Sequence, residues 1–326
     1  MSHKLSNLIK STFVNRVKMS RQELISQIMR IQQYGTKPII EGEHVVSPPL
    51  TVPKHIVRPD YVDNPNPVFG IYNGKPVVHN KEMQQKMRKA GKVGAKVLKY
   101  IMGQVKEGVS TNDLDVLIHN YIIEQGAYPT PLGFMHFPKS VCSSVNEVLC
   151  HGIPNSRKLQ NGDWINLDVT LFIDGVHGDN SGMVCVGDVH PDVQNLIKVT
   201  QKAVYESIKI CRPGTPIKQI GEVCQQVAED NGYINCELFT GHGVGEKLHM
   251  PPIVQHQKND SPHIMEPGMV FTIEPIFMMK PGPYVMWQDD FTILSPGVPS
   301  AQWEHMVMIT EDGHEVLTKR DDEDIE

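Results

Sequence analysis

Hydrophobic positions with helical spacing occupy two consecutive stretches in the middle of the chain. Between residues 81 and 106, apolar side chains recur every three or four positions and stop before Gly108, which predicts a helix. A second helix is predicted from Thr111, a candidate N-cap, to Gln125, with Gly126 as its C-terminal stop. The compact part of the chain is therefore expected to begin near residue 81.

The pattern of this second helix recurs 106 residues further along the chain. Apolar periodicity alone could produce part of this similarity between the two segments. The glycines that precede and follow both segments favour a duplication, in which the chain consists of two similar halves. Two similar halves would pack around a shared cleft to which each contributes residues. Five positions align without a gap: Gly108 with Gly214, Leu114 with Ile220, Leu117 with Val223, Tyr121 with Val227, and Gly126 with Gly232.

Between the two helical regions, residues 166–187 alternate between apolar and polar positions on both sides of Asp174–Gly175. Asp-Gly between two such runs predicts a hairpin with a two-residue turn. With this turn, Thr170 lies opposite Asp179, and Asp168 shares a face with Thr170 because side chains alternate along a strand. Asp168 and Asp179 are then diagonal neighbours, about 7–8 Å apart at the backbone. We expect their carboxylates to converge.

Two further acids lie in apolar runs, Glu274 in MVFTIEPIF and Glu304 in SAQWEHMVMIT. An unpaired buried carboxylate costs several kcal/mol, so each acid needs a cation or a proton. No Lys or Arg lies near them in the sequence. Together with His242, the four acids make a set whose charge matches two divalent cations. Oxygen-rich ligation with one nitrogen suits Mn, Co, Fe or Zn.

The stretch that contains His242, GHGVGEKLHMPP at residues 241–252, could be a phosphate-binding loop, a metal site or a flexible turn. A dinucleotide loop needs a helix directly after its glycines. Pro251 and Pro252 prevent such a helix, and the Lys-Ser/Thr ending of a Walker loop is missing. We therefore favour the metal site, with the three glycines letting the backbone approach the metals closely.

Composition narrows the class of protein. The 326 residues, 40% hydrophobic and 21% charged, suit one large globular domain or two smaller ones. The net charge of −6 gives no reason to expect a nucleic-acid or membrane partner, and no apolar run reaches the ~18 residues of a membrane span. The six cysteines, Cys150 among them, contain no C-x-x-C pair, which indicates reduced core thiols rather than a zinc finger.

The first 80 residues differ from the rest. Residues 1–40 carry seven Lys and Arg against one acid, Glu23, which is typical of an organellar transit segment; a solvated basic arm is the alternative. Residues 41–80 are rich in Pro and Val and are expected to form an extended strap. Residues 81–326 are expected to form the catalytic domain.

An ordered set of motifs over residues 81–319 resembles type 1 methionine aminopeptidase. The resemblance implies an α+β pita-bread fold, with an antiparallel sheet backed by helices in two pseudo-twofold halves. The basic start and VPKHIVRPDYV resemble the mitochondrial branch, because the zinc fingers of the cytosolic branch are absent. The motifs are CHGIP (150–154), NLDVT (166–170), HGD (177–179), GHGVG (241–245), FTIEP (271–275) and SAQWEH (300–305).

The resemblance also implies roles for individual residues. Two divalent metals would be held by five ligands, with Asp179 and Glu304 bridging, and Glu274 would act as the proton shuttle. His151 and His249 would hydrogen-bond the substrate amide or the developing oxyanion. The ligands are Asp168, Asp179, His242, Glu274 and Glu304, and the apolar methionine pocket is expected to comprise Phe134, Phe137, Cys142, Leu248 and Phe291.

Three positions depart from the family pattern and bear on the pocket. Asn180 replaces the usual threonine after the bridging Asp, and HMPP replaces a more common acid-containing run after the second histidine. Phe291 stands for the pocket tryptophan, with Trp287 four residues earlier. The expected reaction is removal of N-terminal methionine from nascent or imported proteins by a mitochondrial monomer. A cytoplasmic location and ribosome association stay open. The alternatives are an Xaa-Pro peptidase of the same fold and a non-catalytic ribosome- or RNA-binding relative.

Overall fold

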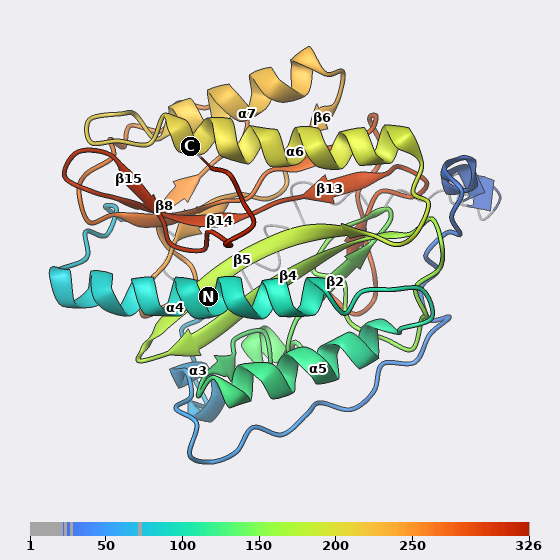
Figure 1. The fold of residues 1–326 in the computed structure, drawn as a ribbon, viewed down its shortest axis with the longest axis horizontal. Helices are drawn as coiled ribbons and strands as arrows, with labels where there is room; N and C mark the ends of the chain where they lie inside the picture. Colours follow the sequence, from blue (N-terminus) through green and yellow to red (C-terminus); the bar gives the residue numbers. More distant parts are fainter. Residues whose placement is uncertain (1–21, 23–24, 27–28, 71–73, 326) are drawn as a thin grey trace.

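The computed structural model describes residues 22, 25–26, 29–70 and 74–325. Two pairs of helices flank a set of antiparallel strands (Figure 1). The α4/α5 pair lies in the lower half of the view and the α6/α7 pair in the upper half. The helices of the described chain are η1 Arg30–Tyr34, α3 Asp60–Asp63, α4 Lys81–Met102, α5 Thr111–Glu124, η2 Phe134–His136, α6 Pro191–Lys209 and α7 Lys218–Asp230.

The strands form four antiparallel sheets, with the orders β1-β4-β2 (β5 also pairs with β4), β13-β10-β6, β11-β12-β3 and β15-β14-β9-β7-β8. The strands are β1 Tyr128–Pro129, β2 Cys142–Val145, β3 Val148–Cys150, β4 Trp164–Ile173, β5 Val176–Cys185, β6 Ile234–Asn235, β7 Gly241–Gly243, β8 Met250–Val254, β9 Val270–Ile273, β10 Ile276–Met278, β11 Val285–Met286, β12 Ile293–Leu294, β13 Ser300–Gln302, β14 His305–Ile309 and β15 His314–Val316.

The predicted helices α4 and α5 are present, with two corrections at their ends. α4 stops at Met102, four residues earlier than expected. The N-cap of α5 is Ser110 rather than Thr111, which is the first helical residue. The reason is a capping box: Asp113 N–H donates to Ser110 Oγ at 3.1 Å, and Ser110 N–H donates to the Asp113 carboxylate at 2.9 Å.

The predicted internal repeat is confirmed in the backbone. Gly108 and Gly126 have φ of +85° and +74°, and Gly214 and Gly232 have φ of +86° and +72°. These left-handed values favour glycine, so the matching glycines in the two halves bracket α5 and α7 for the same reason. Each helix pair covers its own hydrophobic core, with Leu114 in one and Ile220 in the other. The molecule has the pseudo-twofold, pita-bread arrangement that the motifs implied.

The predicted hairpin is formed by β4 and β5. Its register pairs Ile173 with Val176 and Thr170 with Asp179, as expected from the Asp174–Gly175 turn. α4 packs closely on this hairpin: a Cβ at Gly178 would lie 2.6 Å from the Ala90 carbonyl oxygen. The close approach holds β5, and with it Asp179, directly against the helix layer.

The two halves meet at the middle of β5. Ser181 and Glu304 exchange backbone hydrogen bonds of 3.4 and 3.3 Å, outside the regular strand ladders. This bridge connects the β4/β5 hairpin to the segment between β13 and β14. The contact therefore brings acids of the first and second halves to the same place, which is the shared cleft expected from the repeat.

Within residues 1–40, the part from Ile31 to Ile39 packs on the folded body. Ile31 and Tyr34 of η1 are buried in the core beneath α6 and α7. Further along, the Thr36 hydroxyl donates to Asp163, and the Ile39 N–H donates to Glu147 Oε1 at 2.9 Å. The expected boundary at residue 40 thus falls within a segment that contributes to the core, and most of the predicted transit segment lies outside the described residues.

From residue 41 the chain continues as a strap, which Figure 1 shows running beneath α5 towards α3. It has little regular structure apart from α3. Its contacts are polar at first: the Val45 N–H donates to Ser156 Oγ at 2.9 Å, and His119 Nε2 lies 3.1 Å from the Thr51 carbonyl oxygen. These bonds fasten the strap to the α5 side of the molecule.

The cysteines lie mainly in the interior, as predicted, with Cys185 as the exception. Cys150 and four others are buried and unbridged. Cys185 is exposed because it lies at the end of β5, where the hairpin reaches solvent. Within the described part of the chain, no helix has the length and apolar character needed to cross a membrane.

Candidate metal centre

Five potential ligands converge where the two halves meet. Asp168 and Asp179 come from β4 and β5 and His242 from β7, whereas Glu274 directly follows β9 and Glu304 directly precedes β14. His242 Nε2 lies 3.6 Å from Asp179 Oδ2 and 3.5 Å from Glu274 Oε1. One ligand atom each of Asp179, His242 and Glu304 lies within 4.8 Å of the others. The acids that the sequence singled out are therefore neighbours in space.

Hydroxyl groups from neighbouring strand positions orient the acids. Thr170 Oγ1 donates to Asp179 Oδ1 at 2.6 Å, across the hairpin register described above. Thr272 Oγ1 donates to Glu274 Oε1 at 2.8 Å and accepts from the His242 N–H at 3.0 Å. Each hydroxyl leaves other carboxylate oxygens available, so the acids are fixed in direction without losing all their acceptor capacity.

Electrostatics make the cluster unfavourable without a cation. Burial, together with repulsion from the neighbouring acids, raises the pKa of Asp168, Glu274 and Glu304 well above the ordinary range. Burial also raises the pKa of Asp179. Within residues 29–70 and 74–325, no Lys or Arg forms an ion pair with any of these four acids. The donor set of buried carboxylates beside one imidazole thus fits a divalent metal.

His242 is suited to ligation because it is neutral. Burial lowers its pKa to about 4, which leaves a ring nitrogen lone pair available near neutral pH. Its Nδ1 lies 3.1 Å from the Gly243 carbonyl oxygen, so this nitrogen carries the proton and Nε2 faces the acids.

The glycines around His242 allow close packing of the backbone. A Cβ at Gly241 would lie 2.4 Å from the Thr272 carbonyl oxygen, and one at Gly243 would lie 2.3 Å from the Pro251 carbonyl oxygen. A Cβ at Gly245 would meet the His79 ring at 2.6 Å. These glycines therefore let the β7 segment fit between β9, β8 and the His79 ring, and close approach of their backbone to the metals stays a prediction.

His249 and His151 lie beside this cluster. The His249 ring meets the His242 ring edge-on, with 4.4 Å between centroids. Burial and the nearby imidazoles of His242, His151 and His177 lower the pKa of His249 well below its ordinary value. His151 follows β3 with a left-handed φ of +55°, and burial lowers its pKa to about 4. Both rings are neutral near pH 7 and can donate or accept a hydrogen bond.

The five expected pocket residues divide into two groups. Phe137, Cys142 and Phe291 form one apolar cluster, joined by Ile153, which sequence reasoning missed. The Phe137 and Phe291 rings meet at 88° with 5.1 Å between centroids. Cys142 pairs across the strands with Asp168, so this cluster borders the acids.

The other two expected pocket residues lie elsewhere. Phe134 packs against His249 instead, with 5.5 Å between ring centroids. Leu248 is buried but lies outside the Phe137 cluster. Phe134 and Leu248 therefore lie outside the cluster formed by Phe137, Cys142 and Phe291.

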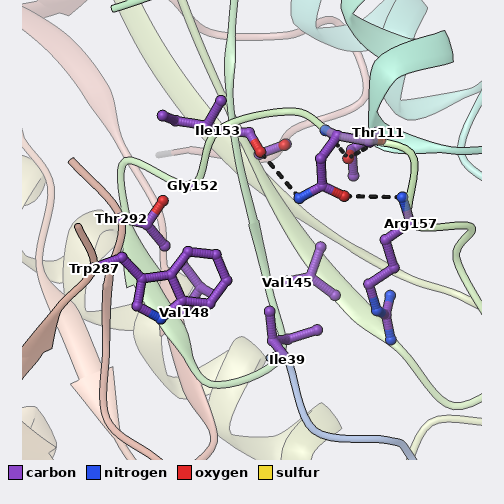
Figure 2. A pocket seen from close by; sticks show the side chains of 11 residues that line it. Ile39, Thr111, Val145, Val148, Gly152, Ile153, Arg157, Trp287 and Thr292 are labelled. Atoms are coloured by element: carbon purple, nitrogen blue, oxygen red, sulfur yellow. Dashed lines mark hydrogen bonds between the residues drawn. The ribbon is translucent and has the colours of Figure 1, made fainter. Parts of the chain in front are cut away.

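A second pocket lies on the other face of β2 (Figure 2). Ser143 and Val145 line it, because side chains alternate along the strand and Cys142 points the opposite way. Figure 2 shows Trp287 at one end and Arg157 at the other, with Ile39 closing one side. Trp287 therefore lines this second pocket, whereas Phe291 belongs to the Phe137 cluster.

Several supporting residues were not identified from the sequence. Gln302 Nε2 lies 3.5 Å from Glu274 Oε2, and the Glu274 N–H donates to His256 Nε2 at 3.0 Å. Gln302 and Glu304 are two positions apart in SAQWEH, so strand alternation could have placed both on one face. His256 had no such signal, because only the fold brings it next to Glu274.

The chain matches a known family and named relatives. The model of metallopeptidase family M24 matches residues 85–311. A protein named methionine aminopeptidase 1D, chloroplastic/mitochondrial, from Arabidopsis thaliana is 44% identical over 84% of this chain and 78% of its own length. The human protein named methionine aminopeptidase 1D, mitochondrial, is 42% identical over 84% of this chain and 82% of its own length.

A solved structure has the same fold. The crystal structure of methionine aminopeptidase from Rickettsia prowazekii superposes with a TM-score of 0.73 at 39% identity. It covers 75% of this chain and 100% of that one. The similarity thus extends over the whole catalytic body of the solved enzyme.

Proposed function

The chain belongs to metallopeptidase family M24 and to its type 1 methionine aminopeptidases, and from this membership we propose which residues carry the reaction. It is a metal-dependent hydrolase that removes N-terminal methionine from peptides and proteins. We assign the divalent metals to Asp168, Asp179, His242, Glu274 and Glu304. The observation that carries this assignment is the convergence of four buried acids and a neutral imidazole with no Lys or Arg paired to them in the described chain.

Two metal ions are proposed rather than one, because four carboxylates would leave an uncompensated charge around a single divalent ion. Asp179 and Glu304, which each bring one ligand atom to within 4.8 Å of His242, would hold these ions together with the other three ligands. Oxygen-rich ligation with one nitrogen is compatible with Mn, Co, Fe or Zn. When bound, such ions supply Lewis acidity that polarises a carbonyl and lowers the pKa of water.

The protein side chains would position the substrate and move protons. Glu274 is the proposed proton shuttle, since its pKa is raised by burial and by Asp179, and Thr272 and His256 hold its position. It would take a proton from the attacking water and deliver it to the departing amine. His249 and His151, both neutral, are proposed to hydrogen-bond the scissile amide and its developing oxyanion.

Methionine selection is proposed to reside in the cluster of Phe137, Cys142, Ile153 and Phe291, together with Leu248 and with Phe134, which packs against His249. An unbranched thioether fits between aromatic rings and gains sulfur–aromatic contacts of ~0.3–1.5 kcal/mol. A charged side chain would lose its hydration in this apolar cluster without gaining a partner. The Xaa-Pro alternative is not favoured, because the relatives of 42–44% identity are named methionine aminopeptidases.

We further propose a mitochondrial location, in line with the names of those two relatives and with the basic, acid-poor start. Because Ile31 and Tyr34 pack in the core, a cleaved segment would have to end before Ile31 rather than at residue 40. A cut between Ile31 and residue 40 would remove buried side chains.

The assignment can be tested with one ligand variant and one distant control. Asp179→Asn keeps the shape of the side chain and removes a charge, and it should reduce both the metal content and the release of methionine from Met-Ala-Ser. Asp188→Asn, at an exposed position, should change neither. Full metal content and activity in Asp179→Asn would rule out its role as a ligand.

A further inference from the structure

A continuous series of aromatic rings connects the N-terminal strap to the metal centre. Phe69 of the strap meets the Phe134 ring at 76° with 5.1 Å between centroids, and Tyr61 of α3 meets it at 88° with 5.3 Å. Phe134 in turn meets His249 at 5.5 Å, and His249 meets His242 at 4.4 Å. The strap therefore touches the same ring that touches the substrate-binding histidine.

The loop that carries Phe134 has a strained backbone. It begins at Gly133, and the two residues after Phe134, Met135 and His136, have φ of +49° and +75°. Residues other than glycine rarely adopt such values, which persist only where the surrounding structure holds them. Two of the ring contacts that hold this loop from outside come from the strap.

Those contacts come from a buried and a half-buried ring. Tyr61 is 7% exposed, and its hydroxyl donates to the Thr130 carbonyl oxygen at the start of the loop. Phe69 is half-buried, and its neighbour Gly70 forms a parallel backbone bridge with His249. The strap thus contacts both members of the Phe134–His249 pair, one through side chains and the other through the backbone.

We propose that Tyr61 and Phe69 are positioning residues of the active site, which hold Phe134 and His249 in the orientation needed for substrate. This inference rests on the proposed roles of His249 and Phe134. Perpendicular ring pairs restrict rotation of the central ring, and a shift of a catalytic group by about 1 Å can reduce the rate by about a hundredfold. The strap then acts on methionine selection and turnover rather than only covering the surface.

The strap is anchored independently of these rings, which makes the inference testable. Lys247 forms an ion pair with Asp60 at the start of α3, and Thr51 is bonded to His119 as described above. Removing the Phe69 ring should therefore leave the strap attached. Val68, the preceding residue, is 55% exposed and offers a matched control in the same segment.

The experiment compares Phe69→Ala, Phe69→Tyr and Val68→Ala in the full chain with the wild type. Metal content, melting temperature and kcat/KM are measured for Met-Ala-Ser and for its Leu analogue. Phe69→Ala should lower kcat/KM for the Met peptide by about tenfold and reduce the preference for Met over Leu, at unchanged metal content. Phe69→Tyr, which keeps the ring, should restore both quantities, and Val68→Ala should match the wild type.

Three results would overturn the inference. The first is a Phe69→Ala enzyme whose activity and Met/Leu preference stay within about twofold of the wild type. The second is a loss of activity that follows metal content or folded fraction while the preference is unchanged, since that indicates support of the fold alone. The third applies if Phe69→Ala does not fold: a folded Phe69→Leu variant, which keeps the apolar bulk without the ring, with unchanged activity and preference. A wild-type protein that releases no methionine would instead contradict the proposed function itself.

Discussion

Glu304→Gln separates the electrostatic role of this acid from its role in packing, because glutamine has nearly the same shape and no charge. Glu304 is 3% exposed, and burial and the acids around it raise its pKa well above the ordinary value. In the metal-free protein the native state therefore favours the protonated side chain, and the unfolded state favours the ionised one. The stability contribution of Glu304 is then lost progressively as the pH rises above about 4.3.

The size of this effect has an upper limit. Protonating a carboxyl group of ordinary pKa at about pH 7.5 costs about 1.4 kcal/mol per pH unit, or roughly 4 kcal/mol in total. Glu304 cannot destabilise the metal-free native state by more than this, because it would take up a proton instead. Glu304→Gln should thus raise the free energy of unfolding of metal-free protein by up to about 4 kcal/mol at about pH 7.5, and by almost nothing near pH 4.5.

When metal is bound, the wild type should be more stable than Glu304→Gln. A ligand present at about a hundred times its Kd stabilises the native state by about 2.7 kcal/mol, and the variant lacks one of the charges that bind it. Its kcat for Met-Ala-Ser should fall by at least about a hundredfold, as for the loss of other single electrostatic contributors. Urea unfolding of metal-free and Mn-loaded protein measures both stabilities, with exposed Glu266→Gln as the control. A Glu304→Gln variant that is less stable than wild type without metal would show that a protein cation already balances this acid.

The remaining predictions concern the buried acid at the N-terminal segment, the pocket and the targeting segment. Burial raises the pKa of Glu147 to about 8, so the free energy of unfolding of the wild type should fall as the pH rises from about 5 to about 8. In urea unfolding, Glu147→Gln should reduce this dependence of stability on pH, whereas Glu124→Gln at an exposed position should not. The same pH dependence in wild type and Glu147→Gln would contradict the assignment. The wild type should cleave norleucine peptides more slowly than Met peptides, by about tenfold at most, and should not release Val or Lys. Phe137→Ala should lower kcat/KM for Met peptides while changing the metal content less. Equal release of Lys and Met by the wild type would rule out the pocket. A fusion of residues 1–45 to a fluorescent reporter should enter mitochondria and be cut before Ile31, whereas diffuse cytosolic fluorescence would indicate a solvated arm.

Local chemistry explains which parts of the fold were predictable. The Asp174–Gly175 turn set the register of the β4/β5 hairpin, because Asp-Gly accepts the positive φ values of a tight two-residue turn, here +52° and +86°. The hairpin then placed Thr170 opposite Asp179 with no knowledge of the rest of the chain. The predicted helix ends were wrong by a few residues, because side-chain hydrogen bonds decide which of two neighbouring residues caps a helix. At the start of α5, these bonds make Ser110 rather than Thr111 the N-cap.

Contacts between distant segments were not predictable from residue patterns alone. The Ser181–Glu304 bridge, the His256 bond to Glu274 and the packing of Phe69 on Phe134 join residues far apart in the sequence. No periodicity encodes such pairs. The position of the four acids in apolar runs suggested a common site, because buried carboxylates need a cation. The residues that contact these acids could be identified only in the structure.

The most direct measurement is the release of methionine from Met-Ala-Ser by protein stripped with a chelator, before and after adding Mn or Co, beside hydrolysis of an Xaa-Pro peptide. We predict that the stripped protein is inactive and less resistant to urea, and that added metal restores methionine release but no Xaa-Pro cleavage. Full methionine release after exhaustive chelation would contradict the metal centre, and preferential cleavage of the Xaa-Pro peptide would contradict the methionine pocket.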